Sequence, residues 1–263
     1  MNGRVLIIAG SDSGGGAGVQ ADIKTVTMLG GYAATAIAAL TVQNSLGVTG
    51  VHPVPPAFVQ AQMRAVLDDI GADAVKTGML GDAATVAAVA DVLEAYPARP
   101  LVVDPVMVAK GGARLLDEAA VGAVIARLLT LATLLTPNTP ELAALTGRTI
   151  ASEAEALAAG RHLVASGVRA VLVKGGHLEG DEVVDWLLGA DGEHRFASPR
   201  IATRHTHGTG CTLASAIACG LARGLALPDA VAAGRDYVQR AIRAAPGFGA
   251  GHGPLGHNFA VLP

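Results

Sequence analysis

The segment His207-Gly208-Thr209-Gly210-Cys211 places a glycine-rich turn and a nucleophilic side chain at the start of an apolar run that continues to Leu221. The two glycines allow a tight turn in which several backbone N–H groups point at one spot, and a helix N-terminus adds roughly half a positive charge there. Such a turn suits the charge that develops on a phosphoryl group during transfer. The same field would favour the thiolate of Cys211. A turn that merely caps a buried helix with an inert cysteine is the other interpretation.

Known nucleotide-binding motifs do not explain this turn. The chain has no G-x-x-x-x-G-K-[ST] sequence, which excludes a P-loop enzyme. Gly10–Gly16 follows an apolar run and fits the dinucleotide-binding frame only loosely, because Val19 stands where the last glycine would be. A dinucleotide role is therefore disfavoured.

Three charged residues stand where apolar runs end. Asp104 follows the run 101–103, and its short carboxylate is placed to face the crevice at the end of a strand. Lys174 ends the run 170–173, where a buried cation needs a partner, either a nucleotide phosphate or a crevice acid such as Asp104. Glu141 is either a ligand of the site or an acid that complements the dipole of a helix first turn.

Short apolar runs alternate with longer segments of helical periodicity along the whole chain. We expect strands at 5–9, 34–40, 74–77, 101–103, 134–136, 170–174 and 183–188, and helices at 19–29, 57–70, 85–94, 118–129, 153–165, 211–222 and 230–244. Strands that are apolar throughout and are followed by helices indicate a three-layer α/β fold, with a mostly parallel central sheet and helices on both faces. Ligands bind such sheets beyond the carboxyl ends of the strands.

Length and charge limit the classes of function. The 263 residues suffice for a single domain over 1–263, and no linker or repeat divides them. The net charge of −3 is spread without a run of Lys or Arg, which disfavours nucleic-acid and anionic-membrane partners. No apolar stretch approaches the ~20 residues of a spanning helix.

The cysteines and histidines give little sign of disulfide or metal chemistry. Cys211 and Cys219 are eight positions apart, roughly 12 Å along a helix, which is too far for a disulfide. A reducing, cytoplasmic location is expected. The eight histidines form no helical H-x-x-x-H pair and no Cys–His cluster, so a structural zinc is not expected.

Motifs along nearly the whole chain resemble those of the hydroxymethylpyrimidine and phosphomethylpyrimidine kinases of thiamine biosynthesis, which belong to the ribokinase-like superfamily. The resemblance begins with segment 9–25, which opens with Ala9-Gly10-Ser11-Asp12-Ser13-Gly14-Gly15-Gly16-Ala17-Gly18. It continues, in order, through segments 39–45, 75–80, 103–107, 136–141, 173–177, 205–212 and 253–257. Eight separated motifs in order make chance agreement negligible.

The resemblance implies roles for individual residues. Gly208 and Gly210 would form the anion hole, and Cys211 would be the catalytic base where sugar kinases of the superfamily carry Asp. Asp104 and Glu141 would serve the Mg²⁺ and phosphate environment. ATP would also contact Asn138, Lys174, Thr206 and Thr209, and Lys110 would belong to a lid or a phosphate contact. The substrate ring would lie against Gly10, Asp12, Ala17, Gln43, Met79 and Val106.

The resemblance thus implies ATP- and Mg²⁺-dependent phosphorylation of 4-amino-5-hydroxymethyl-2-methylpyrimidine and of its monophosphate, by a homodimer. Cys211, at the position where sugar kinases carry Asp, argues against a sugar substrate. The Gln43 amide offers donor and acceptor groups for an aminopyrimidine edge. Pyridoxal or pyridoxine kinase is the alternative activity, because that branch shares the fold and the cysteine motif. A non-catalytic sensor of pyrimidines or nucleotides is the alternative of another class.

Overall fold

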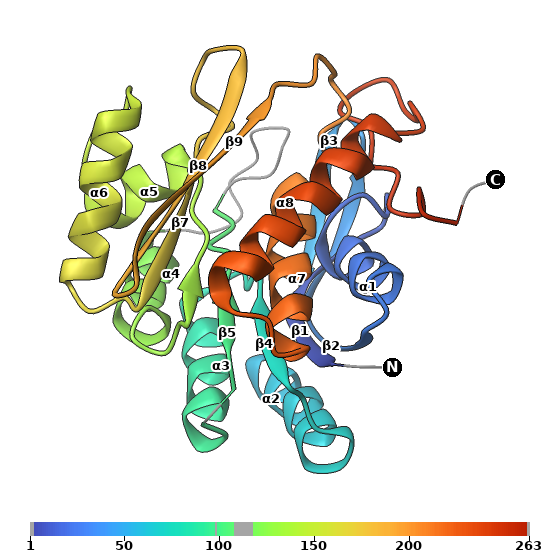
Figure 1. The fold of residues 1–263 in the computed structure, drawn as a ribbon. Coiled ribbons are helices and arrows are strands. Elements are labelled where there is room, and N and C mark those ends of the chain that lie inside the picture. Colours follow the sequence, from blue (N-terminus) through green and yellow to red (C-terminus); the bar gives the residue numbers. More distant parts are fainter. Residues whose placement is uncertain (1–2, 98, 108–117, 262–263) are drawn as a thin grey trace.

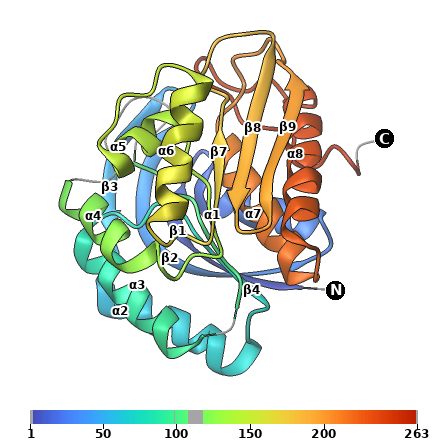
Figure 2. The same ribbon diagram turned by 60° about the vertical axis from the view of Figure 1, so that its left-hand side comes forward.

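A computed structural model describes residues 3–97, 99–107 and 118–261 (Figures 1 and 2). Within these residues one sheet contains nine strands in the order β3-β2-β1-β4-β5-β6-β7-β8-β9. The strands are β1 (Arg4–Asp12), β2 (Tyr32–Asn44), β3 (Gly47–Pro53), β4 (Ala74–Thr77), β5 (Leu101–Val103), β6 (Leu134–Leu135), β7 (Ala170–Lys174), β8 (Glu182–Gly189) and β9 (Gly192–Pro199).

The centre of the sheet is parallel and its two edges are antiparallel. All neighbours from β2 to β7 pair in parallel, whereas β3 pairs antiparallel with β2, β8 with β7, and β9 with β8. The prediction of a mostly parallel sheet is therefore confirmed. Two strands were not predicted, because β3 and β9 carry glycine, proline and exposed polar residues instead of a continuous apolar run.

Helices cover both faces of the sheet (Figure 1), as the apolar strands predicted. The helices are α1 (Gly18–Met28), α2 (Pro56–Ala65), α3 (Ala83–Ala95), α4 (Glu118–Ala123), α5 (Thr139–Thr146), α6 (Glu153–Ala165), α7 (Thr209–Ala222) and α8 (Leu227–Arg243), with π-helical turns η1 (Val66–Ile70) and η2 (Val124–Leu128). Helices α1, α7 and α8 pack on one face around Ile7 and Ile217, and α2 to α6 pack on the other around Leu6 and Leu135. Alternate residues of β1 thus enter opposite cores.

The predicted helical segments at 57–70 and 118–129 each end in a π-helical turn, η1 and η2 respectively. Helix α5 was not among the helices predicted from periodicity, since its eight residues give too short a pattern, although a helix first turn at Glu141 was one interpretation of that residue. The side chain of Asn138 caps this helix by accepting the N–H of Glu141, and the Glu141 carboxylate accepts the N–H of Asn138. This capping box fixes Glu141 at the carboxyl end of β6.

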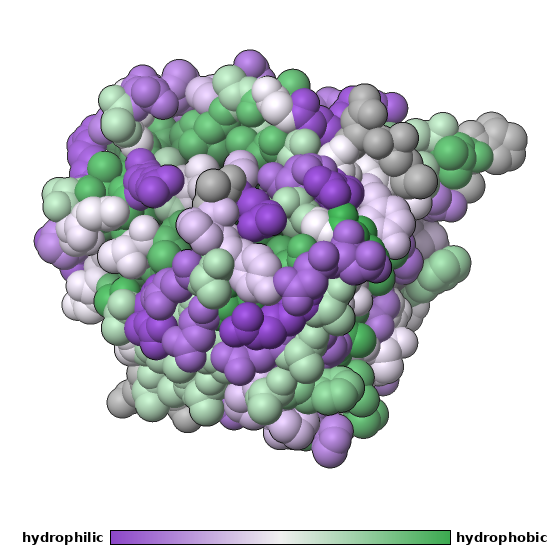
Figure 3. Space-filling view, turned by 90° about the horizontal axis from the view of Figure 1, so that it is seen from below, coloured by the Kyte–Doolittle hydropathy of each residue, from purple (hydrophilic) through white to green (hydrophobic). Residues whose placement is uncertain are grey.

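The surface outside the cleft mixes residue types. On the face seen from below in Figure 1, hydrophilic and apolar residues alternate over short distances (Figure 3). Several exposed apolar side chains lie along the β2–β3 edge, among them Val42 and Leu46. Among the described residues, no helix combines the length and the apolar character needed to cross a membrane.

Candidate active site

A cleft of about 1050 Å³ lies beyond the carboxyl ends of the parallel strands. The structure brings to this cleft every site residue predicted from the sequence and described here, namely Gly10, Asp12, Ala17, Gln43, Met79, Asp104, Val106, Asn138, Glu141, Lys174, Thr206, Gly208, Thr209, Gly210 and Cys211. Lys110 lies outside the described residues. Placement on one cleft does not test the roles of these residues, which stay predictions.

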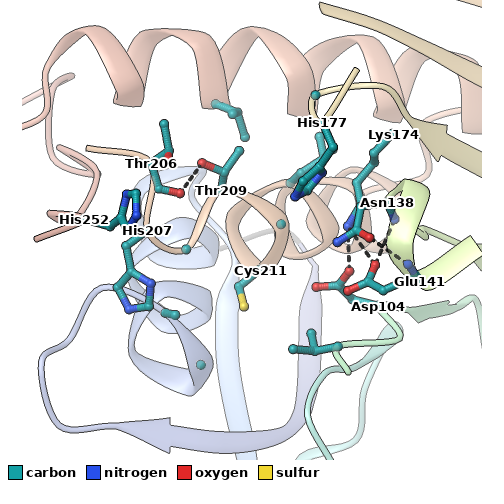
Figure 4. A pocket seen from close by; sticks show the side chains of 18 of the residues that line it. Asp104, Asn138, Glu141, Lys174, His177, Thr206, His207, Thr209, Cys211 and His252 are labelled. Atoms are coloured by element: carbon teal, nitrogen blue, oxygen red, sulfur yellow. Dashed lines mark hydrogen bonds and ion pairs between the residues drawn. The ribbon is translucent and has the colours of Figure 1, made fainter. Parts of the chain in front are cut away.

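Two acids and a lysine form a cluster at one end of the cleft (Figure 4). The Lys174 ammonium lies 3.0 Å from Asp104 Oδ1 and 3.8 Å from Glu141 Oε2. Asp104 also accepts a hydrogen bond from the hydroxyl of Thr136, at 3.1 Å. The sequence offered two partners for Lys174, a nucleotide phosphate or a crevice acid. In the structure the Lys174 ammonium contacts the crevice acids Asp104 and Glu141.

Burial and neighbouring charges shift the pKa values of Glu141 and Lys174 in this cluster. Burial raises the pKa of Glu141 to about 7, although the ammonium of Lys174 acts in the opposite direction. Burial also disfavours the ammonium of Lys174, but the charges of Asp104 and Glu141 outweigh it and raise the pKa of Lys174. The lysine therefore stays charged and offers a fixed positive centre to an anion.

One carboxylate oxygen of this cluster is free to bind a cation. Asp104 Oδ2 is buried and has no hydrogen-bond partner, which is a costly arrangement unless a ligand or water binds there. Gly210 lies opposite, and a Cβ at this position would be 3.6 Å from the same oxygen, so the glycine keeps the approach open. Among the described residues, His, Cys, Asp and Glu side chains form no group of three or more that would enclose a metal ion with protein ligands alone. The unpartnered oxygen of Asp104 and the nearby carboxylate of Glu141 fit Mg²⁺, which is commonly held by one or two carboxylates together with water and substrate phosphates.

The N-terminus of α7 faces the middle of the cleft. Gly208 precedes the helix with a φ of 84°, a left-handed conformation that glycine adopts without strain. The first backbone N–H groups of a helix have no intrahelical partner, and here they lie beside the acid–lysine cluster. The Thr209 hydroxyl donates to the Thr206 carbonyl at 2.8 Å, so without ligand its proton is engaged within the turn.

Cys211 lies between the acid–lysine cluster and His207 (Figure 4). The expectation that the helix N-terminus makes it a thiolate is wrong, because the surroundings raise the pKa of the thiol. Removal of water raises the pKa of Cys211 to about 12, while the positive charge of Lys76 and a hydrogen bond from the Gly18 backbone N–H act in the opposite direction. The negative charges of Asp22 and Asp104 raise the pKa of the thiol further.

The loop after β1 is folded around the carboxylate of Asp12. This carboxylate accepts the backbone N–H groups of Gly14, Gly16 and Ala17 at 2.8, 3.0 and 2.8 Å. It also contacts Nε2 of His207 at 2.9 Å. Burial works against the charged form, but these bonds prevail and lower the pKa of Asp12. Asp12 therefore holds the loop against the turn that precedes α7.

The remaining predicted substrate residues surround this loop. Met79 is buried, and its terminal methyl lies against Gly10, where a Cβ would overlap it. The Gln43 amide lies 3.3 Å from His207 Nε2 and 3.1 Å from Thr41 Oγ1. Apolar surface and an amide thus face the same end of the cleft.

Sequence reasoning did not single out several residues of the cleft, and three of them make notable contacts. His207 was read only as part of the glycine motif, although its ring joins Asp12 to Gln43. Lys76 is a charged residue inside a short apolar strand, which is itself a signal of a special environment. Arg235 on α8 binds Asp185 at 2.8 Å, and no local pattern distinguished it from a surface arginine.

Comparison with known proteins agrees with this geometry. A family model described as phosphomethylpyrimidine kinase matches residues 12–256. The hydroxymethylpyrimidine/phosphomethylpyrimidine kinase of Streptomyces coelicolor is 51% identical over 257 residues, which cover 98% of this chain and 95% of that protein.

The chain is also similar to a longer bifunctional protein and to a pyridoxal kinase of known structure. The thiamine biosynthesis bifunctional protein ThiED of Geobacter sulfurreducens is 54% identical over 98% of this chain, and the chain spans 53% of that protein. The crystal structure of a Bacillus subtilis pyridoxal kinase in complex with ADP superposes with a TM-score of 0.92, at 32% identity and with full coverage of both chains.

Proposed function

Because this chain belongs to the phosphomethylpyrimidine kinase family, we propose that it transfers the γ-phosphoryl group of ATP to hydroxymethylpyrimidine and to its monophosphate. The observation that carries the proposal is one cleft that joins an acid–lysine cluster, a helix N-terminus with a glycine turn, and an amide beside apolar surface. The first two features suit nucleotide phosphates, and the third suits a polar aromatic ring.

In the proposed reaction the nucleotide phosphates lie along the cluster of Asp104, Glu141 and Lys174 and the N-terminus of α7. ADP binding by the related pyridoxal kinase supports a nucleotide in this fold. Asp104 and Glu141 would hold Mg²⁺, which neutralises phosphate charge when bound. The backbone N–H groups after Gly208 donate to the transferred phosphoryl oxygens, and Lys174 compensates their charge.

Cys211 is the proposed base of the transfer. The substrate hydroxyl oxygen forms the new O–P bond, the bond between the β,γ-bridging oxygen and the γ-phosphorus breaks, and the hydroxyl proton passes to the Cys211 thiolate. The position of Cys211 between the acid–lysine cluster and the loop held by Asp12 supports this role. The loop and Gln43 orient the ring so that its hydroxymethyl group faces the cysteine.

A coupled assay of ADP release tests the proposal, with hydroxymethylpyrimidine, its monophosphate and pyridoxal as parallel substrates. Turnover is expected with the two pyrimidines. Faster turnover of pyridoxal would assign the chain to that activity, which its likeness to the B. subtilis enzyme keeps as the second candidate. Absence of transfer to any of them would favour the sensor alternative.

The role of Cys211 is tested with Cys211→Ser and Cys211→Ala. Loss of a general base lowers kcat by about 100-fold or more, while the acid–lysine cluster that we assign to ADP stays intact, so the Kd for ADP should be unchanged. Turnover near the wild-type rate in either variant would reject Cys211 as the base. ADP binding by calorimetry controls for loss of fold.

Magnesium, a homodimer and a cytoplasmic location complete the proposal. The free Oδ2 atom of Asp104 supports the metal, and the apolar β2–β3 edge supports association of two copies. Omission of Mg²⁺ should abolish turnover, and sedimentation velocity measures the state of association.

A further inference from the structure

A completely buried ion pair lies beneath the cleft. Lys76 on β4 and Asp22 on α1 both have side chains with 0% exposure, and the Lys76 ammonium lies 2.8 Å from Asp22 Oδ2. The other carboxylate oxygen, Oδ1, accepts the hydroxyl of Ser215 on α7 at 2.7 Å. Three elements from distant parts of the sequence thus converge on one pair of charges.

The helix period of α7 connects this pair with Cys211 through Ser215. Ser215 follows Cys211 by four positions on α7, so the two side chains lie on the same face of the helix, one turn apart. Ser215 binds the carboxylate that binds Lys76, and both Lys76 and Cys211 line the cleft. Gly78 leaves room above the ammonium, since a Cβ there would be only 2.9 Å from Lys76 Nζ.

Packing alone does not explain these charges. A buried ion pair loses its hydration, and apolar residues of similar volume often stabilise a protein as well or better. The ammonium has a stable positive charge, because the charge of Asp22, its hydrogen bond with Lys76 and the charge of Asp104 oppose the effect of burial and raise the pKa of Lys76. A permanent cation therefore lines the same cleft as the thiol that the reaction needs as a thiolate.

We propose that Lys76 is a positioning residue of the transfer: its ammonium, held by Asp22 and Ser215, stabilises the thiolate of Cys211. The inference rests on the proposed function, in which Cys211 is the base. The other charged groups that act on the sulfur are Asp22 on α1, Asp104 after β5 and Lys174 on β7, and the Gly18 N–H donates to it. Of these groups, Lys76 is the cation with the largest effect on Cys211.

The reactivity of the thiol tests this role without substrate. Modification of Cys211 by methyl methanethiosulfonate at pH 8.5 depends on its thiolate fraction, and mass spectrometry distinguishes it from the buried Cys219. Lys76→Met leaves Asp22 unpaired and should lower the Tm. The double variant Lys76→Met/Asp22→Asn removes both charges, keeps an acceptor for Ser215, and should restore the Tm.

The double variant decides between a structural and an electrostatic role. We expect its modification rate and its kcat to stay about tenfold or more below wild type, because a change of one pKa unit alters the thiolate fraction tenfold. Recovery of both rates together with the Tm would overturn the proposal. Arg161→Met, which breaks an exposed pair with Glu193, is the matched control and should change neither rate.

Asp22→Asn alone provides an independent arm if the double variant does not fold. It removes the opposing negative charge and keeps the ammonium, so the modification rate should rise while the Tm stays near that of the wild type. Damage to the structure would also expose the thiol, but it would lower the Tm and turnover together. An unchanged or lower modification rate overturns the role of Lys76. Near wild-type turnover of Cys211→Ala would instead overturn the proposed base, so the two failures are distinguishable.

Discussion

Replacement of Gly208 by alanine should push the loop after β1, which Asp12 holds, away from the glycine turn at the start of α7. A Cβ at position 208 would overlap the carbonyl oxygen of Gly16 and lie 2.9 Å from its carbonyl carbon and 3.3 Å from Cα of Ala17. The backbone at 208 also has a φ of 84°, which costs a residue with a side chain about 1–2 kcal/mol. Forced overlap in packed structure adds about 1–3 kcal/mol. The free energy of unfolding should fall by roughly 2–5 kcal/mol.

Gly224→Ala is the matched control, because Gly224 has a φ of 85° and an added Cβ would meet nothing within 4 Å. Urea unfolding of this variant should show the backbone cost of about 1–2 kcal/mol alone, with kcat unchanged. The Gly208→Ala enzyme should lose kcat as well, since the loop held by Asp12 must move away from α7. Equal losses of stability in the two variants, or unchanged kcat in Gly208→Ala, would refute the reasoning.

Two further predictions follow from side chains around the cleft. Gln43→Ala should raise the KM for the pyrimidine sharply and leave the KM for ATP nearly unchanged in steady-state kinetics; equal effects on both would remove Gln43 from the ring site. His257 is buried, and desolvation lowers its pKa to about 4, so the folded state binds fewer protons than the unfolded state between pH 6.5 and 4. Stability should therefore decline as pH falls through this range, by roughly 3 kcal/mol in total. A folded His257→Gln protein should show a flatter profile of Tm against pH, and an equally steep one would exclude His257 as the cause.

The central part of the fold could be predicted because its strands are buried on both faces. Runs such as 5–9 and 170–173 are apolar throughout, and their parallel pairing follows from the helices between them. The edges could not be predicted in this way. Residues 192–199 pair with β8 although they alternate glycine and polar residues with half-buried ones, so tertiary pairing and not local preference makes them a strand.

The membership of the cleft could be predicted from the motifs, but its electrostatics could not. The sequence shows Cys211 at a helix start, which suggests a thiolate, whereas the degree of burial that raises its pKa depends on every element packed around it. The contacts of Lys76 and His207 are made by partners far away in the sequence, Asp22 and Asp12 respectively. Periodicity and spacing contain no information on such pairs.

The contacts of Asp12 with His207 and of Asp22 with Ser215 join residues 195 and 193 positions apart. During synthesis, at ~5–20 residues per second, the later partner leaves the ribosome roughly 10–40 s after the earlier one. Until α7 has been synthesised, the carboxylate of Asp22 lacks its partner Ser215 and the loop after β1 lacks its contact with His207. Binding of ATP and of the pyrimidine in the proposed site therefore requires that α7 has folded. A chain halted before this helix is expected to bind neither ATP nor the pyrimidine.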